Sequence, residues 1–132
     1  MKFDFRIIPH HKERYDSVGD YFIRHGVWNF RVSRMQDKRY CWLVFLHEII
    51  EWTICKLMGV KVRDIDRFDI AYEKARKLNR RAPCGCNCEV EPGDDVHSPY
   101  FDAHQTATHC ERLIASALGV NWDKYNNAVE SL

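Results

Sequence analysis

The chain begins with positions that alternate between apolar and polar side chains. Residues 3–8 follow this pattern and end at Pro9, which is typical of a short edge strand. Residues 21–35 are rich in aromatic and β-branched side chains, and His25-Gly26 interrupts them where a hairpin turn fits. We therefore expect a small antiparallel sheet at the N-terminal end.

A helical period then replaces this alternation. Between residues 39 and 58 the apolar side chains recur at intervals of three and four residues, which predicts one long helix. Asp37 is placed to cap its start and Gly59 to end it. The side chains that carry the period are Trp42, Phe45, Leu46, Ile49, Thr53 and Leu57.

Further helices are expected downstream. An apolar stripe predicts a helix that starts near Asp64 or Asp66 and ends before Pro83. A face of small residues predicts another from about residue 100 to residue 118, and a last short helix follows Asn121. The predicted fold class is α+β, a small N-terminal antiparallel sheet packed on a core of three to four helices.

Composition and charge narrow the class of protein. The 132 residues are 45% hydrophobic and 13% aromatic, which is enough for one core, so we expect a single domain spanning residues 1–132. A net charge of +1 lacks the positive excess that binding to nucleic acid uses. Charges near the N-terminus and the lack of a long apolar run predict a cytoplasmic protein without a membrane segment.

The chemistry is concentrated in the long predicted helix, where His47, Glu48 and Glu51 interrupt an apolar run. Burying ionisable groups is costly unless a metal, a counter-charge or hydrogen bonds compensate them. His47 and Glu51 are four residues apart and share one helix face, where they can chelate one ion. This spacing resembles the HExxH zinc helix, with Glu51 in place of the second histidine and Glu48 at the position of the general base.

A third ligand is expected from the later helix. His104, Thr108 and Glu111 share a face there, and His104 would complete a set of two histidines and one glutamate around a divalent metal, most simply zinc. Glu111 is either a fourth ligand that closes the site or an acceptor that orients His104. A closed site is structural, whereas an open one can activate water for hydrolysis.

Two alternatives compete with these assignments. The buried polar groups could form a network with arginines instead of binding a metal, and Arg24, Arg31, Arg34 and Arg39 are available for it. Asp66 and Asp69 most simply favour the dipole at a helix start. Together with Glu48 and Glu51 they also faintly resemble the paired acidic helices of the all-α nucleotide pyrophosphohydrolases, which hold magnesium.

A cysteine cluster marks the loop over residues 83–99. Cys84, Cys86 and Cys88 alternate with other residues, unlike the CxxC pairs of zinc fingers. They could form a second metal site, with His97 or Cys110 as a further ligand, or a disulfide. Cys41 and Cys55 fit better as small core residues of the long helix.

Most of the chain also resembles a family of small uncharacterised bacterial and phage proteins that carry an HExxE helix with a zincin-like motif. The resemblance implies a shared fold and a shared site at His47, Glu51 and His104, with no activity to carry over. It is carried by Val18-Gly19-Asp20, Val32-Ser33-Arg34, Leu46-His47-Glu48-Ile49-Ile50-Glu51, Phe68-Asp69, Glu91-Pro92-Gly93-Asp94, Pro99-Tyr100, His104, Ala107, Glu111 and Leu118-Gly119-Val120-Asn121-Trp122.

These observations leave three functional hypotheses. The preferred one is a minimal zinc-dependent hydrolase, for example a peptidase, with Glu48 as general base. The second is a non-enzymatic, metal-stabilised binding or accessory protein of a phage or mobile element. The third is a magnesium-dependent nucleotide pyrophosphohydrolase. The sequence identifies neither the substrate nor the oligomeric state.

Overall fold

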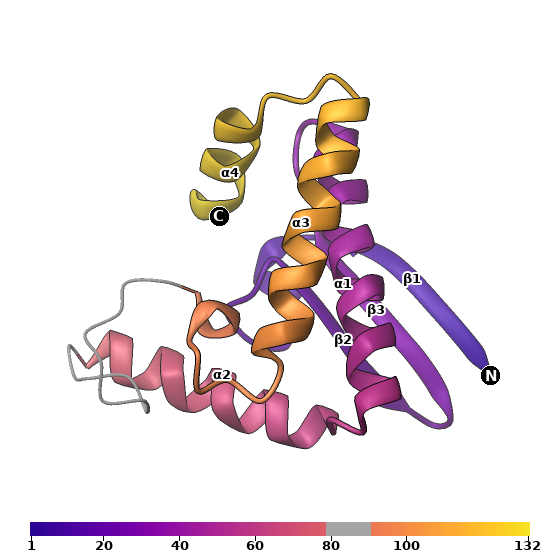
Figure 1. Ribbon diagram of the computed structural model, residues 1–132, viewed down its shortest axis with the longest axis vertical. Helices are drawn as coiled ribbons and strands as arrows, with labels where there is room; N and C mark the ends of the chain where they lie inside the picture. The colour runs from indigo at the N-terminus through magenta and orange to yellow at the C-terminus, as the bar shows by residue number, and fades with distance from the viewer. Residues whose placement is uncertain (79–90) are drawn as a thin grey trace.

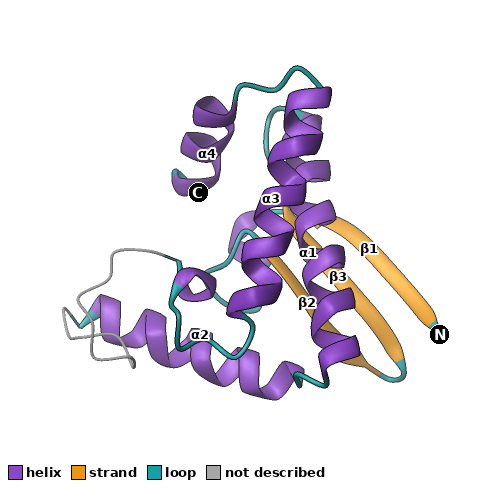
Figure 2. Ribbon diagram, in the orientation of Figure 1, coloured by secondary structure: helices purple, strands orange, loops and turns teal. Residues whose placement is uncertain are grey.

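A computed structural model describes residues 1–78 and 91–132 of the chain. The predicted cysteine cluster at Cys84, Cys86 and Cys88 therefore lies outside the described residues. In the described part, a small sheet near the N-terminus packs against four α-helices (Figures 1 and 2), which confirms the predicted α+β fold class. No helix in this part is long and apolar enough to cross a membrane.

The sheet has three strands, β1 (Lys2–Ile8), β2 (Gly19–Arg24) and β3 (Val27–Ser33), in the order β1-β3-β2. The predicted hairpin joins β2 and β3, which pair antiparallel. His25 and Gly26 both adopt the left-handed backbone conformation, with φ of 51° and 73°, as a tight two-residue hairpin turn requires.

The pairing of β1 differs from the expected antiparallel sheet, because β1 pairs with β3 in parallel. Residues 9–18, which include the short helix η1 (His10–Lys12), carry the chain from one edge of the sheet to the other. The hairpin then returns β3 between β1 and β2, in the same direction as β1. A pattern of alternating side chains does not encode this crossing.

The long predicted helix is α1 (Lys38–Met58), and its ends follow the sequence signals. The Asp37 side chain accepts a hydrogen bond from the backbone N–H of Arg39, and Gly59 ends the helix in the left-handed conformation, with φ of 76°. The Phe45 ring packs against the rings of Phe5 and Phe30, at centroid distances of 4.2 and 5.9 Å. These contacts hold α1 against one face of the sheet.

The remaining helices are α2 (Val62–Lys77), η2 (Pro92–Asp94), α3 (Phe101–Ala117) and α4 (Trp122–Glu130). The start predicted for α2 was wrong, because the helix begins at Val62, after Lys61, and Asp64 lies in its first turn. Asn121 caps α4 by accepting a hydrogen bond from the backbone N–H of Lys124. Both ends predicted for α3 are within one residue of the observed ends.

Helices α1 and α3 lie side by side and run in opposite directions (Figure 1), and more residues meet between them than between any other pair of helices. Ala103, Ala107 and Ala115 are buried along α3. These small side chains allow the two backbones to approach closely. The functional groups described below depend on this approach.

The packing between α1 and α3 can be tested with Ala107→Leu. Ala107 is completely buried, so added methylenes should force side chains or backbone apart and lower the free energy of unfolding by about 1–3 kcal/mol. Ala117→Leu on the exposed part of α3 is the matched control, and urea unfolding measures both. Equal stability of the two variants would contradict a tightly packed interface.

Candidate metal centre

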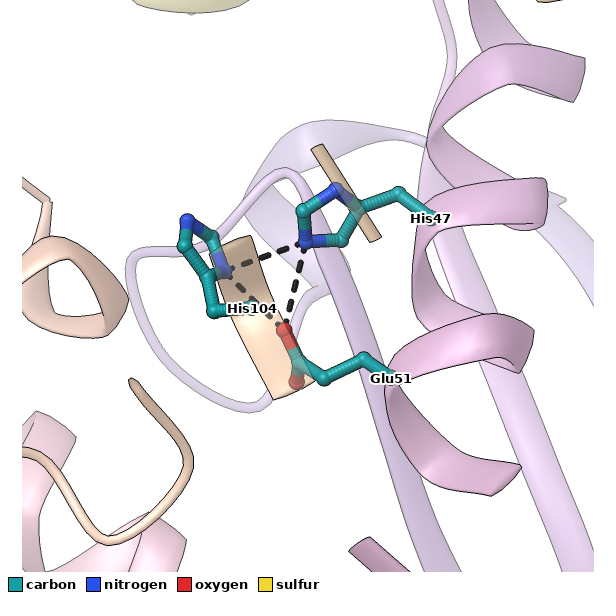
Figure 3. Close-up of side chains that lie close together, drawn as sticks. All are labelled: His47, Glu51 and His104. Atoms are coloured by element: carbon teal, nitrogen blue, oxygen red, sulfur yellow. Dashed lines mark hydrogen bonds and ion pairs between the residues drawn. The ribbon is translucent and has the colours of Figure 1, made fainter. Parts of the chain in front are cut away.

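Three side chains from α1 and α3 converge on one point (Figure 3). His47 and Glu51 lie one turn apart on α1, and His104 lies in the first turn of α3. Nε2 of His47 is 3.2 Å from Oε2 of Glu51 and 3.1 Å from Nδ1 of His104, which is 3.0 Å from the same carboxylate oxygen. All three residues are buried. We call them the ligand triad.

Carboxylates outside the triad indicate which nitrogen of each histidine carries a hydrogen. Nδ1 of His47 is 2.8 Å from Oε2 of Glu111, and a carboxylate only accepts, so this nitrogen carries a hydrogen. Nε2 of His104 lies 3.4 Å from Oδ1 of Asp94, an ion-pair distance at which the carboxylate also favours a hydrogen on this nitrogen. An imidazole that is neutral and holds its hydrogen on this outer nitrogen presents the lone pair of its other nitrogen to Glu51.

No arrangement of protons satisfies the three short contacts together. Hydrogen bonds from both imidazoles to Glu51 need two N–H groups, which would then face each other across 3.1 Å. With one N–H group, the second nitrogen directs a lone pair at the carboxylate oxygen. A single metal cation makes all three contacts favourable. Ligand atoms of a tetrahedral zinc ion lie about 3.3 Å apart, close to the observed spacing.

The environment of each ligand orients it toward this point. The hydroxyl of Tyr21 donates to Oε1 of Glu51 at 2.9 Å and leaves Oε2 free for the triad. The Gln105 amide donates to Asp94, which faces His104. Gly93 packs directly on the imidazole of His104, because a Cβ atom there would lie 2.5 Å from its Cγ. Such supporting contacts are typical of metal sites.

Glu111 contacts His47, whereas one predicted role was to orient His104. Its Oε2 accepts from His47, and its Oε1 accepts a short hydrogen bond from the hydroxyl of Tyr125 in α4. Glu111 thus lies on the side of the His47 ring that points away from the triad. This position fits an orienting residue and does not fit the alternative role of a fourth ligand.

The electrostatics of the triad reflect its burial and its hydrogen bonds. Burial alone lowers the pKa of His104, but hydrogen bonds to Asp94 and Glu51 raise it to about 9. The pKa of His47 is also above its usual value, because hydrogen bonds to Glu111 and Glu51 outweigh burial. Burial raises the pKa of Glu51, yet contacts with both imidazoles lower it to about 2. Without a metal, protons on the imidazoles balance the charge of Glu51, but they do not make all three contacts of the triad favourable.

Glu48 and the triad line the same cavity, which has a volume of about 700 Å³. Burial, and next to it the charge of Glu51, raise the pKa of Glu48 well above its usual value. The side chain packs against Gly19, where a Cβ atom would lie 2.5 Å from Oε1 of Glu48. The cavity also has walls from α2, η2 and α4.

The alternative network with arginines is not observed within the described residues. Arg31 pairs with Asp4 at 2.6 Å and Arg39 with Asp37 at 2.7 Å, and the counter-charges of Glu51 are the two histidines.

The two acidic residues of α2 also have other partners. Asp66 pairs with Arg14 at 3.2 Å. Asp69 is buried and accepts hydrogen bonds from the hydroxyls of Tyr100 and Tyr15, at 2.6 and 3.3 Å. Burial raises the pKa of Asp69 to about 7 although the Tyr100 hydrogen bond lowers it. Among residues 1–78 and 91–132, neither aspartate belongs to a group placed to hold a metal. The dipole interpretation of Asp69 missed its burial.

The remaining candidate ligands lie apart from the triad. His97 pairs with Asp95 at 3.1 Å, and Cys110 is a partly buried free thiol. Cys41 and Cys55 are buried, as expected for core residues.

Sequence reasoning missed the tyrosines that orient the ligands, Tyr21 and Tyr125, and the carboxylates that face His104, Asp94 and Glu91. Tyr21 sits in a strand and Tyr125 in the last helix, so no local spacing links them to the HExxE segment. The Glu91-Pro92-Gly93-Asp94 segment is distinctive in the sequence only as part of the family resemblance. The sequence signal that could have indicated these contacts is a glycine, Gly93, between two acidic residues.

Comparison of the chain with known protein families, with curated proteins and with solved structures finds no match. The function must therefore be inferred from the geometry of the site.

Gly93→Ala tests whether His104 is a ligand. The added methyl group would overlap the imidazole, displace it from the triad and weaken zinc binding by at least about tenfold. Gly19→Ala is the matched control, since its methyl group would meet Glu48 rather than a member of the triad. Titration calorimetry with zinc compares the two. Unchanged affinity in Gly93→Ala would argue against His104 as a ligand.

Proposed function

We propose that this protein is a small zinc-dependent hydrolase of the zincin-like type, acting on peptide or other amide bonds. The observation that supports it most directly is the ligand triad, whose three contacts no set of protons can satisfy. Two histidines and one glutamate are a ligand set of catalytic zinc sites. The resemblance to the HExxE family implies the same three residues as metal ligands. We propose that the chain is a member of that family.

The residues around the triad have separate roles in this proposal. A zinc ion bound there would supply Lewis acidity and bring the pKa of water into the neutral range. Glu48, next to His47 in the chain and lining the same cavity, accepts the proton from the attacking water and passes it to the leaving amine. Its raised pKa suits a base that works near neutral pH. Glu111 and Tyr21 keep His47 and Glu51 oriented.

The charge of the cavity favours an amide substrate over a nucleotide. Carboxylates predominate in its described lining, where Arg76 is the sole lysine or arginine. Such a wall accepts a neutral or cationic peptide and repels a triphosphate that is not bound to magnesium. Asp66 pairs with Arg14, and Asp69 accepts hydrogen bonds from two tyrosines, so neither is arranged as a magnesium ligand beside Glu48 and Glu51. We therefore do not retain magnesium-dependent pyrophosphate hydrolysis as a candidate.

A structural metal in a non-enzymatic accessory protein is the second candidate. It is favoured by the burial of the triad and by its position between α1 and α3, where an ion would link the two helices and contribute directly to folding. Both candidates require metal binding. They differ in the role of Glu48, which a structural site does not need.

The variant Glu48→Gln separates the two candidates. For a hydrolase, we expect it to keep one zinc ion per chain and to cleave a peptide library at least about 100-fold more slowly than the wild type. His47→Ala is the comparison variant and should lose both zinc and activity. Zinc content and cleavage, read by mass spectrometry, are measured on the same preparations.

Two outcomes would count against the hydrolase. Equal cleavage by wild type and a zinc-loaded Glu48→Gln protein would remove the assigned base. A zinc-loaded wild type that cleaves no peptide, but melts at a lower temperature after chelation, would favour the structural candidate.

A further inference from the structure

The last helix, α4, is connected to the ligand triad through one side chain. Tyr125 is the buried residue of α4, with an exposed fraction of 2%. Its hydroxyl donates to Oε1 of Glu111, whose Oε2 accepts from Nδ1 of His47. A chain of hydrogen bonds therefore runs from α4 through α3 to a metal ligand on α1.

We propose that Tyr125 is a positioning residue that couples docking of α4 to metal binding. The inference rests on the proposed metal site and adds to it: metal affinity should depend on the C-terminal helix, and the position of that helix should depend on the metal. By thermodynamic linkage the two effects have the same magnitude.

The first step concerns the carboxylate of Glu111. Its side chain is only 9% exposed, and each oxygen has one partner, Tyr125 or His47. Without the phenol, Oε1 becomes a buried acceptor with no donor, and the carboxylate gains by rotating or by admitting water. Either change loosens the hydrogen bond that fixes the hydrogen on Nδ1 of His47 and keeps the Nε2 lone pair directed at the metal.

The second step concerns how α4 is held. The Tyr125 ring packs against the rings of Tyr40 and Trp122, at centroid distances of 5.2 and 5.3 Å. The guanidinium of Arg112 lies over Trp122 at 4.7 Å. Trp122 and Val129 of α4 also pack against the hydrophobic cluster that contains Val44 and Ala115, and the buried hydrogen bond to Glu111 adds a polar anchor to this packing. A metal that orders His47 and Glu111 therefore stabilises the partner on which α4 docks.

The coupling bears on the cavity because α4 supplies one of its walls. The cavity lining includes residues of α2 and, beside Tyr125, the α4 residues Trp122, Asn126, Val129 and Glu130. Metal binding should therefore hold α4 more firmly in its place in the cavity wall, in addition to ordering the catalytic centre. A chain without metal would have a less firmly held α4 and a more open cavity.

The test combines zinc affinity with hydrogen exchange on the full chain. Tyr125→Phe keeps the packed ring and removes the hydroxyl, and should weaken zinc binding by about tenfold, the lower end of effects on groups that orient ligands. Tyr40→Phe is the matched control: its ring packs beside Tyr125, but it takes no part in the hydrogen bonds to His47, so its affinity should stay within about twofold of the wild type.

Hydrogen exchange tests the reciprocal effect, first in the wild type and then in Tyr125→Phe. Zinc should slow amide exchange in residues 122–130 of the wild type, and this protection should shrink by about tenfold in Tyr125→Phe. Zinc-bound wild type with unchanged exchange in α4 would overturn the proposal. So would a Tyr125→Phe protein that melts earlier without metal but binds zinc like the wild type, because Tyr125 would then be structural only.

The outcomes separate this inference from the proposed function. A wild type that binds no zinc removes the metal site and the coupling with it. A wild type that binds zinc with the triad, while Tyr125→Phe binds it equally well, keeps the proposed function and removes the coupling.

Discussion

The structure depends on bringing three electron-rich atoms together inside a core. His47 and Glu51 on α1 and His104 on α3 direct two nitrogens and one oxygen at one point, with separations of 3.0 to 3.2 Å. Such an arrangement is unfavourable without a cation, and the close packing of α1 on α3 holds it in place. The alanines of α3 are small for the same reason, since larger side chains would move His104 away from α1.

Much of the remaining architecture can be understood as support for this point. The sheet contributes Tyr21 to orient Glu51, the η2 segment places Gly93 and Asp94 against His104, and α4 contributes Tyr125 to hold Glu111. Parts of the chain that are distant in sequence each contact one ligand. A metal bound at this point would be linked to contacts from each of these parts of the chain.

The helices, the hairpin and the shared face of His47 and Glu51 could be predicted from sequence because their signals are local. His104, 57 residues after His47, could be predicted as their partner only from the small-residue face of its own helix, and the structure brings it to them. Asp37 and Gly59 mark the ends of α1, and the i,i+4 spacing places His47 and Glu51 on one face. The parallel pairing of β1 could not be predicted, since it depends on the path of residues 9–18. The contact of Glu111 with His47 could not be predicted either. The helical spacing places Glu111 on the face of α3 toward α1, but it does not determine which of the two histidines Glu111 contacts. The buried partners of Asp69 come from distant tyrosines that leave no spacing signal.

Metal analysis of the purified protein without an affinity tag tests the central claim most directly. We expect one zinc ion per chain in the wild type, none in His47→Ala, and one in a variant with serine at Cys84, Cys86 and Cys88. Those cysteines offer one competing set of ligands in the sequence, and Glu91, Asp94 and His104 form a second group that could hold a metal. A wild type without metal would contradict the account. Zinc that persists in His47→Ala and disappears with the cysteines would place the metal elsewhere.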